Sequence, residues 1–236
     1  MLLTYLGFHL VFVLPPLAAL LSTASFPLAG RPRVGAAGVA VLTGLALVYT
    51  TPWDNHLIAS GVWSYPADRI LARIWHAPVG EYLFIVLQPL LTALWLYRLP
   101  STVPASLGVS RPQRLAGAAA GLAVGLAGWL VLSAGYYLGT LLLWASPVLA
   151  LQWGVGWPVL WRLRRRLAVA VGVPTAYLCV ADRIAIELGI WRFDHRFMTG
   201  LDVLGLPVEE AAFFLLTNLF VVQGLLLFFW VIDRWG

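Results

Sequence analysis

Long apolar stretches alternate with short polar segments along the whole chain. Seven of these stretches approach the length of about 20 residues with which a helix crosses the hydrocarbon core of a bilayer. They run approximately over residues 3–22, 34–51, 79–97, 115–132, 137–157, 167–183 and 208–231. The pattern predicts an all-α polytopic membrane protein with about seven transmembrane helices.

The polar segments contain an internal repeat. Asp54 stands seven residues before the tripeptide Gly61-Val62-Trp63, and Asp182 stands at the same spacing before Gly189-Ile190-Trp191. The two copies are separated by a constant 128 residues. A repeat of this length indicates that each half of the chain forms one structural unit.

A second match extends the repeat. The heptapeptide Pro-Val-Gly-Glu-Tyr-Leu-Phe at 78–84 aligns with Pro-Val-Glu-Glu-Ala-Ala-Phe at 207–213. The first three spans therefore correspond to the last three, and the fourth span is extra. The sequence predicts two parallel three-helix repeats, residues 1–98 and 137–236, joined by a segment at 99–136.

Composition and charge agree with a membrane protein. Hydrophobic residues make up 61% of the chain and charged residues only 11%, whereas soluble domains carry about a quarter charged residues. The net charge of +5 comes from arginines in short loops, without the basic stripe typical of a nucleic-acid-binding surface. We therefore expect membrane lipid around the protein and no nucleic-acid partner.

The arginines also predict an orientation. Ten of them fall on the side opposite to the N-terminus: Arg31, Arg33, Arg98, Arg111, Arg114, Arg162, Arg164, Arg165, Arg166 and Arg234. Five fall on the N-terminal side, together with nine of the ten acidic residues. By the positive-inside rule, the N-terminus lies outside the cell membrane and the C-terminus lies in the cytoplasm.

Several kinds of chemistry find no support in the sequence. The single cysteine, Cys179, excludes an internal disulfide, a thiolate zinc site and a cysteine-ligated iron–sulfur cluster. No dinucleotide or phosphate-binding glycine motif is present, and His56, His76 and His195 are scattered. Gly117, Gly121 and Gly125 in the fourth span form a small-residue stripe for close helix packing. We expect no metal and no cofactor.

The repeated acidic residues are the candidates for chemistry. Glu81 and Glu210 fall in the first turn of the third and seventh helices, and Asp54 and Asp182 fall at the ends of the second and sixth. Acidic residues at a helix N-terminus also complement the helix dipole, so a purely structural role is an alternative. Embedded carboxyl groups are nevertheless functional candidates by default. Glu209, beside Glu210, adds a like-charged neighbour that favours retention of a proton.

Aromatic side chains accompany these acids. Phe84 and Gln88 follow Glu81 on its helical face, and Phe213, Phe214 and Thr217 follow Glu210, while Trp63 and Trp191 belong to the repeated tripeptides. Aromatic faces attract positive charge. An acid above such faces is suited to a reaction that passes through a carbocation, although packing is the commoner role of these residues.

Taken together, these motifs resemble those of the membrane-embedded lycopene cyclases of the small-subunit type. These occur as two-polypeptide enzymes in some bacteria and as a fused chain in archaea and in fungal bifunctional proteins. The motifs are Pro52-Trp53-Asp54-Asn55 with Gly61-Val62-Trp63, the stretch 78–84 with Leu87-Gln88, and Pro207-Val208-Glu209-Glu210 with Phe213-Phe214. The resemblance covers nearly the whole chain. Gly80 departs from the family pattern, in which an acidic residue is usual at this position.

The resemblance implies a redox-neutral isomerisation of a linear carotenoid such as lycopene. One carboxyl group protonates the terminal double bond, the resulting cation closes a ring, and loss of a proton leaves a β-ring. Glu210 is the expected donor and Glu209 its neighbour or alternate, while Glu81, Asp54 or Asp182 receives the released proton. Phe84, Phe213, Phe214, Trp63, Trp191 and Gln88 are the expected substrate-binding residues.

Other functions stay open at the level of the sequence. A carotenoid cyclase that makes ε-rings or acts on C50 carotenoids has the same motifs. An isoprenoid-transferring enzyme needs a second aspartate near Asp54 and Asp182 for Mg²⁺–diphosphate, and none stands at suitable spacing. A proton-coupled transporter needs a path of acids across the membrane, whereas these acids gather at one face. A homo-oligomer and an association with other carotenoid enzymes are the alternatives for protein partners.

Overall fold

The computed structural model describes residues 3–23, 31–99 and 106–235, and its described part contains seven helices long and apolar enough to cross a membrane. The first is a composite of α1 (Tyr5–Phe8), a π-helical turn η1 (His9–Val13) and α2 (Leu14–Ser22). The others are α3 (Pro32–Ala59), α4 (Val79–Arg98), α5 (Arg111–Val131), α6 (Tyr136–Arg162), α7 (Arg164–Glu187) and α8 (Val208–Trp235). The prediction of an all-α membrane protein with seven spans is confirmed. The division into repeats stays a prediction.

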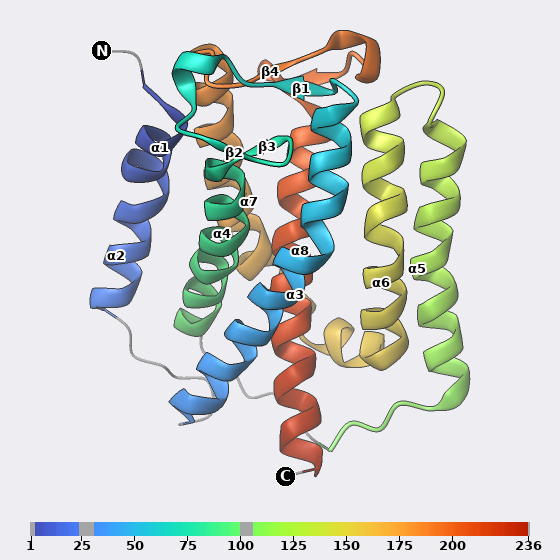
Figure 1. Ribbon diagram of the computed structural model, residues 1–236. Helices are drawn as coiled ribbons and strands as arrows, with labels where there is room; N and C mark the ends of the chain where they lie inside the picture. Colours follow the sequence, from blue (N-terminus) through green and yellow to red (C-terminus); the bar gives the residue numbers. More distant parts are fainter. Residues whose placement is uncertain (1–2, 24–30, 100–105, 236) are drawn as a thin grey trace.

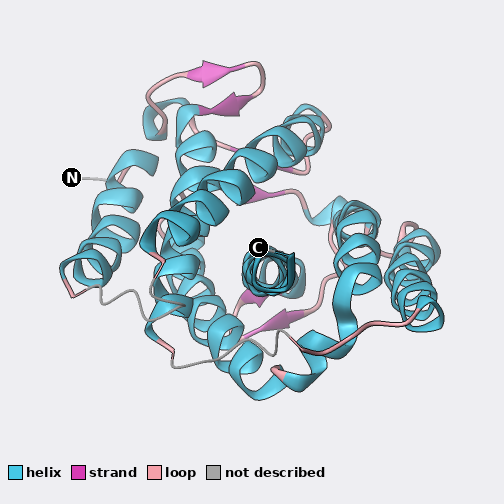
Figure 2. Cartoon of the chain, turned by 90° about the horizontal axis from the view of Figure 1, so that it is seen from below, coloured by secondary structure: helices cyan, strands magenta, loops and turns pink. Residues whose placement is uncertain are grey.

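Helix α8 forms the axis of the bundle. Viewed from below, it lies end-on at the centre, with the other helices around it (Figure 2). It packs against α3, α4, α6 and α7. It is correspondingly apolar and contributes Val222, Leu225 and Leu226, all fully buried.

Helix α5 lies outside this arrangement, at the edge of the bundle, and packs along α6 (Figure 1). Its buried residues are glycines. A Cβ atom at Gly121 would overlap the backbone of Ala150 in α6, and the Ser146 hydroxyl donates to the Gly121 carbonyl over 3.0 Å. On its other face, Leu122 and Leu126 are exposed, as expected for side chains that meet lipid. The glycine stripe therefore attaches α5 to the bundle, as the sequence predicts.

Short strands cover one end of the helices. β1 (Trp63–Ser64) pairs antiparallel with β4 (Arg192–Phe193), and this ribbon joins the two halves of the chain. Two hairpins lie beside it: β2 (Arg73–Ile74) with β3 (Ala77–Pro78), and β5 (Asp202–Val203) with β6 (Leu206–Pro207). Figure 1 shows all of them at the end that carries the N-terminus. Short 3₁₀ turns, η2 (Ala67–Arg69) and η3 (His195–Phe197), lie in the same loops.

The repeated tripeptides end helices α3 and α7 in the same way. Gly61 and Gly189 have φ of 80° and 65°, a conformation that glycine adopts without steric cost. The next amide, of Val62 or Ile190, bonds back to the carbonyl five residues earlier. This is the Schellman arrangement, in which the aliphatic residue after the glycine is buried against the helix. The tryptophan that follows is thereby turned back toward the bundle.

Both helices extend beyond the sequence expectation, which ended them at 51 and 183. Asp54 and Asp182 consequently lie five residues inside α3 and α7 rather than at their ends. A span length matched to the thickness of the bilayer places each helix end where the polar residues begin. The helices continue because these polar residues face the bundle interior, where Asp54 and Asp182 are buried.

The α5–α6 contact leads to a first prediction. Gly121→Ala should lower the stability of the protein in detergent by about 1–3 kcal/mol, the usual cost of overpacking. Gly44→Ala is the matched control, because a Cβ atom there would meet no atom within 4 Å. Thermal melting of the two purified variants checks this. Equal melting temperatures would show that α5 does not depend on the close approach.

Candidate active site

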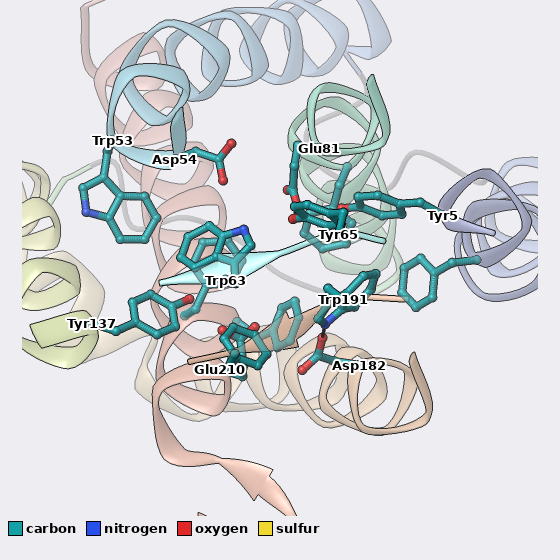
Figure 3. A pocket seen from close by; sticks show the side chains of 15 residues that line it. Tyr5, Trp53, Asp54, Trp63, Tyr65, Glu81, Tyr137, Asp182, Trp191 and Glu210 are labelled. Atoms are coloured by element: carbon teal, nitrogen blue, oxygen red, sulfur yellow. Dashed lines mark hydrogen bonds between the residues drawn. The ribbon is translucent and has the colours of Figure 1, made fainter. Parts of the chain in front are cut away.

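Four carboxyl groups from four helices face one cavity beneath the β1–β4 ribbon. Asp54 comes from α3, Glu81 from α4, Asp182 from α7 and Glu210 from α8 (Figure 3). The cavity has a volume of about 50 Å³. The rest of its wall is aromatic: Tyr5, Phe8, Trp53, Trp63, Tyr65, Phe84, Tyr137, Trp191, Phe193, Phe213 and Phe214. Acids that are far apart in sequence thus share one apolar space.

The residue after each aspartate fixes the hairpin that precedes each glutamate. The Asn55 side-chain oxygen accepts hydrogen bonds from the His76 and Ala77 amides, both over 2.9 Å. At the corresponding position of the second half, the Arg183 Nε donates to the Leu204 carbonyl over 3.1 Å. These contacts fix the start of α4 and α8 relative to α3 and α7. They explain why an aspartate and a glutamate meet in each half.

The two halves hold their glutamates differently. The Tyr65 hydroxyl donates a hydrogen bond to Glu81 Oε1. At the position equivalent to Tyr65, the second half has Phe193, which offers no such donor. Glu210 Oε1 has no hydrogen-bond partner among the described residues, although the Tyr137 hydroxyl points toward this carboxyl group (Figure 3). Glu81 is therefore held as an acceptor, whereas Glu210 keeps a free oxygen.

The aspartates show the opposite asymmetry. The Trp191 Nε1 donates to Asp182 Oδ1 over 3.0 Å. Asp54 Oδ2 and Asp182 Oδ2 are both buried without a hydrogen-bond partner among the described residues. Both aspartates thus keep one unpartnered oxygen, and the bond from Trp191 distinguishes Asp182 from Asp54.

Tyr65 keeps its proton, and so stays a hydrogen-bond donor, because it is buried beside Glu81. Burial first, and then the charge of Glu81, raise the pKa of Tyr65 well above its usual value near 10. The phenol therefore keeps its proton throughout the accessible pH range. Its hydrogen bond stabilises the ionised form of Glu81.

None of the four carboxyl groups forms an ion pair with an arginine or histidine of the described ranges. Leaving an isolated ionised carboxylate in an apolar site costs far more free energy than protonating it. Four of them cannot be ionised together in this cavity, so protons are retained among them. Within the described residues, no cluster of three or more His, Cys, Asp and Glu side chains is arranged to hold a metal ion.

Most of the residues expected from the sequence line the cavity. They are Asp54, Glu81, Asp182, Glu210, Phe84, Phe213, Phe214, Trp63 and Trp191. Two do not. Glu209 is fully buried and accepts hydrogen bonds from the Thr199 amide and hydroxyl, each over 2.7 Å. Gln88 lies one to two turns further along α4, where it donates to Thr92 and Asn218.

Gly80 occupies the position in α4 that corresponds to Glu209. A Cβ atom at Gly80 would overlap the ring of Tyr5. The ring of Tyr5 in turn stacks on Tyr65, with ring centroids 5.7 Å apart. Glycine is thus required for the aromatic wall around Glu81, and an acidic side chain cannot occupy this position without displacing Tyr5.

The sequence interpretation missed the tyrosines Tyr5, Tyr65 and Tyr137. A signal for two of them is present, because Tyr5-Leu6-Gly7 matches Tyr137-Leu138-Gly139 at an offset of 132 residues. The offset differs from the 128 and 129 of the other matches, so a search at one fixed period does not find it. Trp53 lies in the motif at residues 52–55, but the spacing of residues along the chain does not show that its ring faces the acids.

Comparison with known proteins agrees with this geometry. The family model for lycopene cyclase matches residues 3–99 and 129–229. The chain belongs to the lycopene cyclase family. The family match omits residues 100–128, which include most of α5, whereas it contains all four cavity carboxyl groups.

Individual members of the family are similar over nearly the whole chain. It is 50% identical to lycopene beta-cyclase of Halobacterium salinarum over 234 residues, 98% of both chains. It is 34% identical to the bifunctional lycopene cyclase/phytoene synthase of Arthroderma gypseum, over 94% of this chain and 41% of that protein. The corresponding protein of Pyrenophora tritici-repentis is 35% identical, over 93% of this chain and 40% of that protein. No solved structure matches the chain.

The position of Glu209 leads to a second prediction. Glu209→Gln keeps an oxygen that accepts from Thr199, so it should retain most of the cyclase activity. Glu209→Ala leaves the half-buried Thr199 donors unsatisfied and should lower stability by about 1–3 kcal/mol. Product formation and thermal melting of the two variants check this. Loss of activity in a stable Glu209→Gln variant would instead place Glu209 in the chemistry.

Proposed function

We propose that this chain is an isomerase that cyclises the ψ-ends of lycopene, or of a related linear carotenoid, to β-rings. The observation that supports this most directly is the aromatic cavity that four carboxyl groups share, none of them paired with a cation of the described residues. Membership of the lycopene cyclase family and the 50% identity to a lycopene beta-cyclase over 98% of both chains support the choice of substrate and ring.

The reaction needs only proton transfer. A carboxylic acid donates a proton to the terminal double bond, which leaves a tertiary carbocation. The next double bond of the chain attacks this cation and forms the ring bond, and the positive charge moves to the ring. A carboxylate then removes a ring proton, and its electrons form the ring double bond. One proton enters and one leaves, so no oxidant or reductant is consumed.

We assign the donor role to Glu210. A donor must present a protonated oxygen that is free to face the substrate, and Glu210 Oε1 has no other partner among the described residues. The Trp191 Nε1 donates to Asp182 Oδ1, and such a bond favours the carboxylate form. Two neighbouring carboxyl groups rarely ionise together, so a carboxylate at Asp182 favours a proton on Glu210.

We assign the acceptor role to Glu81. Its hydrogen bond from Tyr65 stabilises the carboxylate that must take the proton. Asp54 lies in the same half with a buried free oxygen and can pass the proton on. The two halves then act as acid and base of one site, and the shared cavity is the path by which the donor regains its proton.

The aromatic wall stabilises the intermediate. Ring faces attract a cation by about 0.5–2 kcal/mol each when water is excluded. Trp63 and Trp191 come from the ribbon, and Phe84, Phe213 and Phe214 from the helices. They also keep water away from the carbocation, which water would otherwise trap as an alcohol.

The orientation in the membrane belongs to this proposal. The arginine distribution supports an outside N-terminus and a cytoplasmic C-terminus in the cell membrane. The cavity then lies near the outer face, and the carotenoid reaches it from within the bilayer.

The donor assignment leads to a third prediction. Glu210→Gln removes the acidic proton without a large change in shape, so cyclisation should fall by at least about a hundredfold. The measurement is pigment chromatography of lycopene-accumulating cells that express the variant, with membrane insertion verified by fractionation. A Glu210→Gln variant that makes cyclic products at the parent rate would exclude Glu210 as the donor.

The Tyr65–Glu81 bond leads to a fourth prediction. Tyr65→Phe removes the hydroxyl that stabilises the Glu81 carboxylate, and kcat should fall about tenfold, since hydrogen bonds to charged groups contribute about 1.5–3 kcal/mol. The raised pKa of Tyr65 means that its hydrogen bond persists as the pH rises through the usual phenol value of about 10. The ratio of parent to variant kcat should therefore stay constant from about pH 7 to pH 10. A ratio that falls by about half at pH 10 would show that Tyr65 ionises at the usual phenol pKa.

A further inference from the structure

Two tyrosines at the membrane-facing surface make the same unusual hydrogen bond in the two halves. The Tyr49 hydroxyl of α3 donates to the Trp144 carbonyl of α6 over 2.7 Å. The Tyr177 hydroxyl of α7 donates to the Phe12 carbonyl of η1, also over 2.7 Å. Tyr49 and Tyr177 are 128 residues apart, and Phe12 and Trp144 are 132 apart, so these contacts follow the internal repeat. Each ties together two helices that belong to different halves.

Side chains, rather than close backbone contact, fill the space between α3 and α6. Both helices are described over their full length, and they are not among the helix pairs that pack closely. Instead, Trp144 stacks on Tyr49 with ring centroids 5.7 Å apart and on Trp53 with centroids 4.8 Å apart. Trp53 stacks on Phe213 over 6.2 Å. We call Tyr49, Trp144, Trp53 and Phe213 the aromatic slot.

The aromatic slot runs from the lipid-facing surface to the acids. Tyr49, at its outer end, is 39% exposed, and Trp144 behind it is buried. Trp53 and Phe213, at its inner end, line the cavity with the four carboxyl groups. A flat conjugated chain that replaced the Trp144 ring between its neighbours would make the same face-to-face contacts.

The equivalent space in the other half, between α7 and η1, has fewer aromatic rings. Tyr177 is 38% exposed, and Phe12 contacts Phe8 of the cavity wall with ring centroids 5.3 Å apart. The position equivalent to Trp53 is Ala181, which is buried and offers no ring. Of the two related places, the one between α3 and α6 therefore provides the continuous stacking surface.

The cavity is too small for the group that must react in it. It measures about 50 Å³, whereas a cavity that binds a ligand the size of benzene measures about 150 Å³. A ψ-end folded toward a methylated six-membered ring is larger still. The β1–β4 ribbon covers the cavity on the side of the loops, with Trp63 and Trp191 among its lining residues. The wall must open, and the substrate is dissolved in the bilayer.

We propose that the polyene enters the cavity sideways from the bilayer between α3 and α6, through the aromatic slot, and that the Tyr49–Trp144 hydrogen bond is the latch that keeps this slot closed. Entry breaks one hydrogen bond and replaces ring–ring stacking by ring–polyene stacking. Tyr49 is thus a positioning residue that controls access and takes no part in proton transfer. This inference rests on the proposed cyclase function.

The latch is tested by removing one oxygen atom. Tyr49→Phe keeps the stacking and loses the bond, so kcat/KM for lycopene in liposomes should rise about fivefold, corresponding to a net hydrogen bond of about 1 kcal/mol. Tyr177→Phe, the matched control in the other half, should leave kcat/KM within about 1.5-fold, because its hydrogen bond too is worth about 1 kcal/mol but guards no entrance. An effect of Tyr177→Phe without an effect of Tyr49→Phe would overturn the proposal and place the entrance at η1.

A second experiment blocks the aromatic slot with a bulky chemical label. In a Cys179→Ala background, Tyr49→Cys is alkylated with a bulky aromatic maleimide, and Tyr177→Cys is treated in the same way. Alkylation at position 49 should reduce turnover at least tenfold through a higher KM, whereas alkylation at position 177 should not. Full activity of both labelled proteins would overturn lateral entry between α3 and α6. Failure of the cyclase function itself would appear differently, as no cyclic product in the unlabelled parent.

Discussion

Four carboxyl groups lie around one apolar cavity, and no cation in the part of the chain that the structure describes forms an ion pair with them. The free energy of ionising such a group is prohibitive unless a donor stabilises it. The chain provides donors selectively: Tyr65 for Glu81 and Trp191 for Asp182. Glu210 and Asp54 keep buried oxygens without a partner among the described residues. This distribution of donors makes the four carboxyl groups chemically unequal, and the proposed acid and base roles rest on it.

Duplication also explains the architecture. A unit of three helices begins and ends on opposite sides of the membrane, so a second unit in direct succession would be inverted. Helix α5 returns the chain to the starting side, and both carboxyl pairs then lie at the same face. Because α5 has only this connecting role, a stripe of glycines against α6 is sufficient to hold it. Its position outside the bundle leaves α8 as the shared axis.

The halves have diverged where the chemistry requires it. Tyr65 faces Glu81, but Phe193 stands at the equivalent position near Glu210. Glu209 supports a loop through Thr199, whereas Gly80 makes room for Tyr5. Trp53 completes the aromatic slot, while Ala181 leaves the related place without a ring. Each difference adds a donor, a wall or a stacking surface in the first half, and the free acid remains in the second.

The sequence by itself determined the seven spans and nine of the residues that line the cavity, and it predicts the pairing of the two halves. These follow from local rules: apolar length matches the bilayer, and repeated spacings place repeated residues at repeated positions. Tertiary structure alone decided that Glu209 and Gln88 face away from the cavity, that Tyr5, Tyr65 and Tyr137 face into it, and that Asp54 and Asp182 lie inside their helices. The reason is physical. Which oxygen finds a donor depends on how each loop folds back over its helix, as for Tyr65 with Glu81 and Thr199 with Glu209. Other contacts join distant helices, as for Gln88 with Asn218, 130 residues away, and spacing along the chain encodes neither.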